Sequence, residues 1–299
     1  MKVIVITGPT GVGKTKLSIS IAKKYHGEII NADAMQVYKD LNIGTAKITE
    51  EEKEGVFHHL FDIKNVSEEY SIYDYQKDCR KKIEEIFQRG HVPILVGGTG
   101  LYIKSALYDY HFSSHEQEKR EKYEDKSLSE LNQILKEIDP KGASSIDCYN
   151  KRRVINAIIY YQENGKSIVT NQTNQLLYDS IFIGLTTNRE NLYQIINKRV
   201  DKMIDNGLME EAKSFYEKKI FSKPLLGGIG YKELYSYFEG KISDVEAIDL
   251  IKRNSRRYAK RQYTFFRNQL DIQWFSTNYE NFSKTVEEVS SYLNDRIVK

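Results

Sequence analysis

The chain has few of the residues that stabilise extracellular or repetitive proteins. Only two of its 299 residues are cysteine, Cys79 and Cys148, which excludes a disulfide scaffold and a four-cysteine zinc site. Four prolines and 18 glycines exclude collagen-like and linker-rich chains. No run approaches the roughly 18 apolar residues of a membrane span, and the apolar stretch in MKVIVITGPTG is too short for a signal peptide. We therefore expect a globular protein of the reducing cytoplasm with no membrane partner.

The chain also has no large excess of basic or of acidic residues. The 45 Lys and Arg residues oppose 42 Asp and Glu residues, so the net charge of +3 by itself indicates nothing about nucleic acid. The distribution is uneven, because residues 251–270 hold seven basic residues and no acid. A solvated helix normally mixes both signs at i, i+4. The run therefore favours contact with phosphates over a merely solvated face.

Short apolar runs alternate with helical patterns in much of the chain. The expected strands occupy 2–6, 27–33, 92–96 and 181–185. Strands that alternate with helices predict an α/β fold with a parallel sheet flanked by helices.

Two long stretches depart from this alternation. Between about 110 and 176 the sequence is polar and helical without a strand signal, and from 189 onward it is helical almost to its end. We predict a core domain formed by 1–109 and 177–299, with C-terminal helices, and a helical insertion domain formed by 110–176.

A glycine-rich turn follows the first expected strand and matches G-x-x-x-x-G-K-[ST] in full. This P-loop consists of Gly8, Pro9, Thr10, Gly11, Val12, Gly13, Lys14 and Thr15. Its backbone amides and the N-terminus of the next helix attract phosphate oxygens. Lys14 adds a charge, and the Thr15 hydroxyl can bind Mg²⁺ as a cofactor. The motif predicts a sheet like that of P-loop nucleotide hydrolases and a bound di- or triphosphate, as in ATP-binding proteins, without deciding which.

The residues that an ordinary P-loop enzyme needs next are missing. The strand at 92–96 ends in Gly97-Gly98-Thr99 without a carboxylate for Mg²⁺, and the insertion has one arginine between 110 and 140, Arg120, where a kinase lid needs several. The carboxylate at a strand end is Asp33 instead. It could act as a general base, bind a Mg²⁺-coordinated water, or cap a helix.

Several blocks in a fixed order resemble one family. They are GPTGVGKT, NADAMQVYKDLNIGTAK, HHLFDI, LVGGTGLYIKSAL, LYQIINKRVDKMIDNGLMEEA, GGIGYKEL and KRQYTFFR, and they extend from residue 3 to about 268. Together they resemble the tRNA dimethylallyltransferases, the bacterial tRNA isopentenyltransferase family. The resemblance implies that the P-loop holds dimethylallyl diphosphate. It also implies that the prenyl group moves to the exocyclic amine of the adenosine just 3′ of the tRNA anticodon, with release of diphosphate.

The resemblance also implies roles for single residues. Asp33 matches the family's general base, Lys14 a phosphate contact, and Arg189 an arginine that clamps the leaving diphosphate. A surface arginine at a helix start is the alternative for Arg189. Thr99 matches a position that touches tRNA, and it could equally cap the following helix.

The expected tRNA contacts lie in three segments. They are Asp33, Ala34, Met35, Gln36 and Thr99 near the base, Arg120, Arg152, Arg153, Val154, Ile155 and Asn156 in the insertion, and Arg256, Lys260 and Arg261 in the basic segment. Asn156 stands where the family usually has arginine, Ala34 where serine is common, and Phe265 where tryptophan is common. His58 and His59 point apart as neighbours and have no third ligand nearby, so we interpret them as structural.

Three other functions compete with tRNA prenylation. A P-loop kinase for a small metabolite is disfavoured by the missing carboxylate, and an RNA-binding nucleotide sensor is disfavoured by Asp33 beside the P-loop. Prenyl transfer to free AMP or ATP is disfavoured by the insertion and the basic segment, which suit a large polyanion. We expect a monomer whose partner is a tRNA anticodon stem-loop.

Overall fold

The computed structural model describes residues 2–110, 117–168 and 175–297, and the chain divides into two compact units. One unit comprises Met1–Ala106 and Tyr178–Lys299, and the other comprises Leu107–Leu177. The sequence predicts these boundaries at 109/110 and 176/177.

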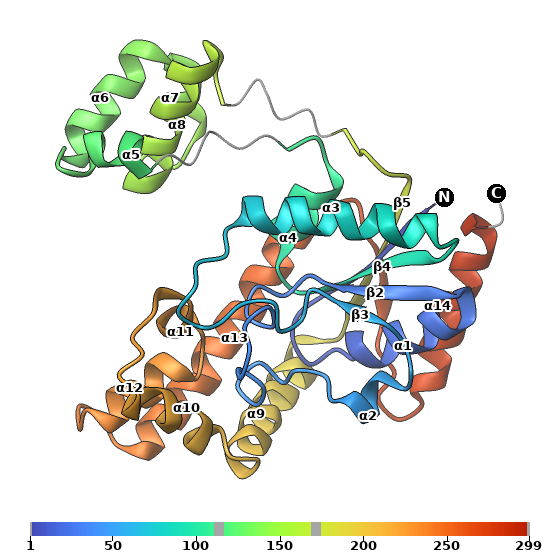
Figure 1. Ribbon diagram of the computed structural model, residues 1–299. Coiled ribbons are helices and arrows are strands. Elements are labelled where there is room, and N and C mark those ends of the chain that lie inside the picture. The colour runs from blue at the N-terminus through green and yellow to red at the C-terminus, as the bar shows by residue number, and fades with distance from the viewer. Residues whose placement is uncertain (1, 111–116, 169–174, 298–299) are drawn as a thin grey trace. The chain divides into compact units, whose positions relative to one another are not determined.

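The first unit is built on a six-stranded sheet in the order β3-β2-β4-β1-β5-β6 (Figure 1). Every neighbouring pair is parallel, which confirms the expected parallel sheet. Two short edge strands, β3 and β6, lie outside the sequence prediction, because neither carries an uninterrupted apolar run. The strands are β1 Val3–Thr7, β2 Gly27–Asn31, β3 His58–His59, β4 Val92–Gly97, β5 Ser180–Thr186 and β6 Gln273–Ser276.

The central strand explains why the sheet must be covered on both faces. All five residues of β1 are buried, as expected for a parallel strand between two helical layers. Ile4 and Ile6 face a core that includes Leu17 of α1 (Lys14–Tyr25) and Val289 of α14 (Phe282–Ile297). Helix α3 (Ile72–Gln88) covers the opposite face (Figure 1).

The strand order reverses between β4 and β1. Ligands of open parallel sheets bind at such a reversal, beyond the carboxyl ends of the strands. The P-loop follows β1, and Gly97-Gly98-Thr99 follows β4, so the fold brings these two turns to the same edge. The sheet topology therefore defines where a site is expected.

The rest of the first unit is helical, as predicted for the C-terminal part. None of the helices within the described ranges is long and apolar enough to cross a membrane. Besides α1, α3 and α14, the helices of this unit are α2 Glu50–Lys53, α4 Gly100–Leu107 (which ends at the unit boundary), α9 Arg189–Asp205, α10 Leu208–Glu217, α11 Lys223–Gly227, α12 Tyr231–Phe238 and α13 Asp244–Gln269.

The second unit contains four helices in its described part: α5 Gln117–Glu124, α6 Leu128–Ile138, α7 Pro140–Ser145 and α8 Lys151–Asn164. Its core joins Leu131 and Leu135 of α6 to Val154, Ile155 and Ile158 of α8. The sequence predicts tRNA contacts for Val154 and Ile155, but their side chains are buried in this core instead. The helical period causes the difference, because it turns these two positions inward and their predecessors outward.

Arg152 and Arg153 are those exposed predecessors in the first turn of α8. Arg120 donates from Nη2 to Asn156 Oδ1 at 3.1 Å, so α5 and α8 are joined by two of the residues predicted to contact tRNA. The second unit therefore presents Arg152 and Arg153 to solvent and uses Asn156 to hold Arg120.

A buried carboxylate ties the amino ends of three strands together. The side chain of Glu28 in β2 is 3% exposed. It accepts from Arg89 Nε at 2.9 Å and Nη2 at 2.8 Å, and it pairs with the rings of His59 and His91. This arrangement agrees with the interpretation of His59 as structural. Burial raises the pKa of Glu28, but the hydrogen bonds from Arg89, His59 and His91 outweigh burial and lower the pKa to about 2.

Replacing Glu28 by Gln should destabilise the fold by about 3 kcal/mol at neutral pH, because it removes the charge of a buried carboxylate that is hydrogen-bonded to Arg89, His59 and His91. Since folding lowers the Glu28 pKa from 4.5 to about 2, the stabilisation is complete above pH 4.5 and is lost as the pH falls toward 2. Urea denaturation at pH 7 and pH 3 measures both effects. The matched control is Glu217→Gln, which removes an exposed ion pair with Lys213 and should cost less than about 1 kcal/mol. Equal losses for the two variants would contradict the prediction.

Candidate active site

The P-loop connects the carboxyl end of β1 to the first turn of α1. Gly8 follows the strand with a φ of 136°, and a Cβ there would lie 2.4 Å from the Leu185 carbonyl oxygen, so the turn requires glycine. Gly13 has a φ of 90° and precedes Lys14, the first residue of α1. Thr277 Oγ1 donates to the Val12 carbonyl oxygen at 2.8 Å and fixes the loop from behind. The sequence therefore forms the predicted strand–turn–helix unit.

Lys14 lies folded against this loop. Its Nζ donates to the carbonyl oxygens of Gly8 at 3.0 Å and Pro9 at 2.7 Å. Burial and, to a smaller extent, the nearby charge of Arg199 lower the pKa of Lys14, the charge of Asp33 opposes both, and the net pKa is about 7. A partly buried ammonium beside a guanidinium is only partly compensated by Asp33, so the loop is electrostatically suited to a phosphate group.

Asp33 is held rigidly just after β2. The Asn31 side chain accepts from Asp33 N at 2.9 Å and donates to Asp33 O at 3.0 Å. Asp33 Oδ1 accepts from Met35 N at 2.9 Å, which is an Asx-type turn and not a helix cap. Within residues 2–110, 117–168 and 175–297, nothing donates a hydrogen bond to Asp33 Oδ2. One oxygen thus orients the carboxylate and the other stays available for a proton.

The turn after β4 supports both the segment after Asp33 and the P-loop. Thr99 Oγ1 accepts from Ala34 N at 3.0 Å, so the Thr99 side chain holds the segment after Asp33, while the Thr99 carbonyl accepts from Tyr102 N in the first turn of α4. Gln262 of α13 accepts from Thr10 N at 3.2 Å and donates to the Gly98 carbonyl at 3.0 Å. The two turns at the strand reversal are therefore joined through α13.

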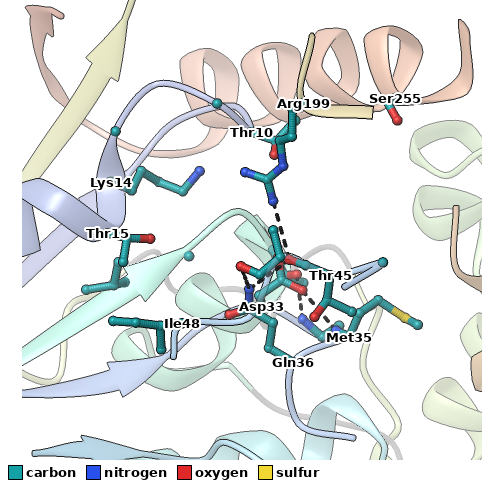
Figure 2. Close-up of a pocket in the computed structure, with 18 of the residues that line it drawn as sticks. Thr10, Lys14, Thr15, Asp33, Met35, Gln36, Thr45, Ile48, Arg199 and Ser255 are labelled. Atoms are coloured by element: carbon teal, nitrogen blue, oxygen red, sulfur yellow. Dashed lines mark hydrogen bonds between the residues drawn. The ribbon is translucent and has the colours of Figure 1, made fainter. Parts of the chain in front are cut away.

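These residues enclose one pocket of about 930 Å³ (Figure 2). Figure 2 shows Lys14 and Arg199 pointing into the space beside Asp33. The P-loop residues that line the pocket are Thr10, Gly11, Gly13, Lys14 and Thr15, and the residues predicted to contact tRNA that line it are Asp33, Ala34, Met35, Gln36, Thr99 and Arg261. Gly8, Pro9 and Val12 support the loop from outside the pocket lining.

The structure does not place Arg189 on the pocket wall. Arg189 is exposed at the start of α9, and its guanidinium lies 5.1 Å from the ring centre of Tyr193. The arginine that lines the pocket is Arg199, ten residues later in the same helix and about 15 Å further along its axis. Burial lowers the pKa of Arg199, and the charge of Asp33 opposes this. The signal for Arg199 was present in the block LYQIINKRVDKMIDNGLMEEA, but sequence alone gives no reason to prefer either arginine.

The basic segment belongs to α13, and its residues differ in exposure. Lys260 and Arg261 are exposed, and Arg261 also reaches the pocket. Arg256 is half-buried, donates to Asn197 Oδ1 of α9 and lies over Tyr193. Arg256, predicted to contact tRNA, therefore joins two helices, and the exposed charge lies on the rest of the helix.

Sequence reasoning also missed two residues of α13 that form the pocket. Gln262 has the contacts given above, and Tyr258 lines the pocket between Thr99 and Gln262. Burial raises the pKa of Tyr258 to about 12, and the charge of Asp33 adds to this. Both residues lie within residues 251–270, where the sequence prediction rests on the basic residues alone.

Comparison with known proteins identifies the family. The model of a family described as IPP transferase matches residues 36–269. The chain is 50% identical to a tRNA dimethylallyltransferase of Anoxybacillus flavithermus over 99% of this chain and 97% of that protein. It is 47% identical to one of Geobacillus kaustophilus with the same coverage.

Solved structures give the same result. A tRNA delta(2)-isopentenylpyrophosphate transferase from Staphylococcus epidermidis is 40% identical, with a TM-score of 0.75 and 99% of each chain covered. A eukaryotic dimethylallyltransferase acting on tRNA is 31% identical, with a TM-score of 0.89, over 99% of this chain and 79% of that one. The chain therefore belongs to the IPP transferase family, the family of the tRNA dimethylallyltransferases.

Proposed function

We propose that this enzyme transfers the dimethylallyl group of dimethylallyl diphosphate to the exocyclic amine of the adenosine 3′ of the anticodon in tRNA, in the cytoplasm. The observation that carries the proposal is the shared pocket of Lys14, Arg199 and Asp33. Two partly buried cations suit the diphosphate, and an oriented carboxylate suits the amine proton.

The bond changes follow from this arrangement. The bond between the allylic carbon and the diphosphate oxygen breaks, and its electron pair leaves with the diphosphate. The adenosine nitrogen forms the new bond to the allylic carbon and loses one proton, which Asp33 accepts. Lys14, Arg199 and the P-loop amides stabilise the charge that develops on the leaving diphosphate.

Mg²⁺ fits this site through the Thr15 hydroxyl. Thr15 lies on the pocket wall in the first turn of α1, next to Lys14. Mg²⁺ commonly takes one or two protein ligands and completes its octahedron with phosphate oxygens and water. When bound, it would neutralise part of the diphosphate charge, and the protein would supply the remaining cations.

Phosphoryl transfer is less consistent with the pocket. A triphosphatase needs a carboxylate for Mg²⁺ after the neighbouring strand, whereas β4 is followed by Gly98 and Thr99, whose atoms are occupied by Gln262 and Ala34. The carboxylate near the P-loop is Asp33, which is fixed by its own turn.

The acceptor must bring its base into a buried pocket, so a nucleotide flipped out of its stack is required. Lys260 and Arg261 on α13, and Arg152 and Arg153 on α8, are exposed cations suited to the phosphates of a tRNA stem-loop. Incubating the protein with labelled dimethylallyl diphosphate and tRNA, AMP or ATP tests the assignment. Label in tRNA alone supports it, and label in AMP or ATP, or none, contradicts it.

Replacing Asp33 by Asn should lower kcat by roughly 10²–10⁴-fold, the usual value of a general base. The amide oxygen can still accept from Met35 N, so tRNA affinity should change much less. Single-turnover prenylation and a tRNA binding titration measure the two quantities. Glu54→Gln is the control, since Glu54 also lines the pocket but pairs with Lys23 at its exposed edge. Full activity of the Asp33 variant would remove the base from the mechanism.

At pH 8, where the diphosphate is essentially fully ionised, binding of dimethylallyl diphosphate without tRNA should take up close to one proton. The Lys14 pKa is about 7 in the free protein, so Lys14 is mostly neutral at pH 8 and becomes charged when the anion arrives. Calorimetry in two buffers of different ionisation enthalpy gives the proton count. A Lys14→Met variant should lose this uptake at pH 8, and an unchanged count in that variant would assign the proton elsewhere.

Replacing Arg199 by Ala should reduce the prenylation rate at saturating substrates by about 10²-fold or more, as expected for loss of a buried contact to the leaving group. Replacing Arg189 by Ala should change it by less than about threefold, because Arg189 is exposed. Steady-state kinetics of the pair decide between the two arginines. A larger loss of rate in Arg189→Ala than in Arg199→Ala would instead assign the contact with the leaving diphosphate to Arg189.

A further inference from the structure

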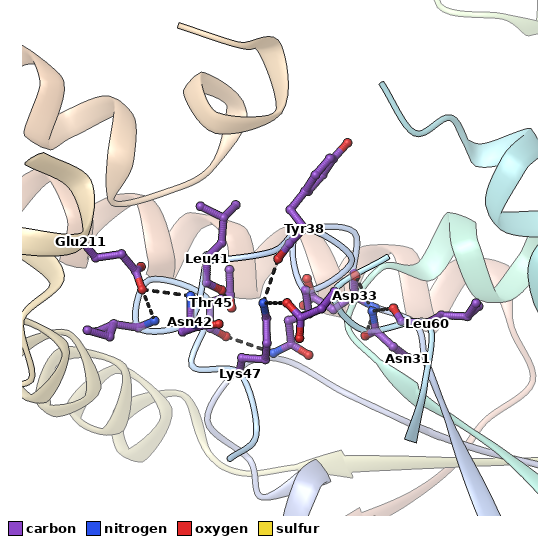
Figure 3. Close-up of polar contacts among 12 residues, drawn as sticks. Asn31, Asp33, Tyr38, Leu41, Asn42, Thr45, Lys47, Leu60 and Glu211 are labelled. Carbon is purple, nitrogen blue, oxygen red and sulfur yellow. Dashed lines mark hydrogen bonds and ion pairs between the residues drawn. The ribbon is translucent and has the colours of Figure 1, made fainter. Parts of the chain in front are cut away.

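A carboxylate that takes no part in the proposed bond changes organises one wall of the pocket. Glu211, in the first turn of α10, accepts four hydrogen bonds, and Figure 3 shows its side chain beside Asn42. Its Oε2 accepts from Asn42 N at 2.9 Å and Ile43 N at 2.7 Å. Its Oε1 accepts from Gly44 N at 2.9 Å and from the Tyr231 hydroxyl at 2.6 Å. These four bonds use the full acceptor capacity of a carboxylate.

The three amide donors are consecutive in the chain. Successive backbone N–H groups that converge on one point form a concave anion site, and here the protein fills that site with its own carboxylate. Charge-assisted bonds of this kind are roughly twice as strong as neutral ones. Close packing adds to the fit, because a Cβ on Gly44 would lie 2.6 Å from the Tyr231 hydroxyl oxygen. The 42–44 segment is therefore held in one position against α10 and α12.

The residue after this segment reaches the reaction site. The Thr45 carbonyl oxygen accepts from Gln36 Nε2 at 3.1 Å and from Arg199 Nη2 at 3.4 Å. Gln36 is a predicted base contact, and Arg199 is the proposed diphosphate contact. Gly44, Thr45, Gln36 and Arg199 all line the pocket. One peptide carbonyl thus orients a side chain for each substrate, and Glu211 fixes the peptide beside it.

The far end of the loop has separate support. Lys47 Nζ donates to the Tyr38 carbonyl at 2.7 Å and pairs with Asp62, and Lys47 N donates to the Asn42 carbonyl at 2.9 Å. The loop therefore remains attached without Glu211. We therefore expect that replacing Glu211 shifts the position of residues 42–45 without unfolding the protein.

We propose that Glu211 is a positioning residue for prenyl transfer, acting through the 42–45 segment on Arg199 and Gln36. The proposal rests on the function proposed above. It assigns to the C-terminal helices α10 and α12 a part in the reaction geometry, although neither carries a group that touches the reacting atoms.

The test compares Glu211→Gln with Glu210→Gln. The two carboxylates are neighbours on α10 and their replacement changes the charge equally, but Glu210 is exposed. Glu211→Gln should lower the single-turnover rate at saturating substrates tenfold or more, with tRNA affinity within about threefold and a single cooperative unfolding transition retained. Glu210→Gln should match the wild type. Hydrogen exchange at the amides of Asn42, Ile43 and Gly44 should quicken only in Glu211→Gln.

A double-mutant cycle separates positioning from general stabilisation. If Glu211 acts through Arg199, its replacement should matter less once Arg199 is gone. In the Arg199→Ala background, Glu211→Gln should lower the logarithm of the single-turnover rate by less than half of the decrease it causes in the wild type. Additive effects would overturn the proposal, and so would a normal rate in Glu211→Gln. If Glu211→Gln fails to fold, Tyr231→Phe removes one of the four bonds and should slow the reaction severalfold at an unchanged fold. A wild-type protein that does not prenylate tRNA would instead refute the proposed function.

Discussion

Two partly buried cations, Lys14 and Arg199, that share one pocket with the Asp33 carboxylate are the constraint on which the site depends. Burial lowers the pKa of Lys14 and of Arg199, the charge of Arg199 also lowers that of Lys14, and the charge of Asp33 offsets part of both effects. A protein retains such an arrangement at a cost in stability, and a bound anion offsets that cost. The diphosphate of the proposed donor supplies that anion, so donor binding and charge compensation are one event.

The surrounding contacts keep these charges in place. Strand ends and turns are flexible by nature, and here each is tied by a side chain from elsewhere in the sequence. Asn31 fixes Asp33, Thr99 fixes Ala34, and Gln262 joins the P-loop to the turn after β4. Buried polar groups that are fully hydrogen-bonded make a site rigid. Rigid placement is what a proton acceptor and a leaving-group contact both require.

Helix α13 combines two roles that are usually on separate elements. Its exposed cations Lys260 and Arg261 suit RNA phosphates, and its buried Gln262 contacts the P-loop. The basic run in the sequence therefore reflects only the outer face of the helix. Arg256 belongs to neither face, because it binds Asn197 and packs on Tyr193 of α9.

The sequence by itself determined the features that are local in the chain. The parallel sheet, the P-loop with Lys14 and Thr15, and Asp33 at a strand end all follow from contiguous residues whose period and turn chemistry dictate their shape. The family, too, could be recognised from contiguous blocks, and the comparisons confirm it.

Only the tertiary structure decided which distant residues meet. It placed Arg199 in the pocket and Arg189 on the surface, because ten residues of helix separate them. It buried Val154 and Ile155 in the insertion core, and it brought Glu211 to three amides about 170 positions earlier in the chain. Short β3 and β6 lie at the two edges of the sheet and have only two and four residues, too few for a strand to be recognised from the sequence. Such contacts depend on how the helices pack against one another. A local sequence pattern does not encode this packing, because a residue's contacts depend on the partner that the fold brings next to it.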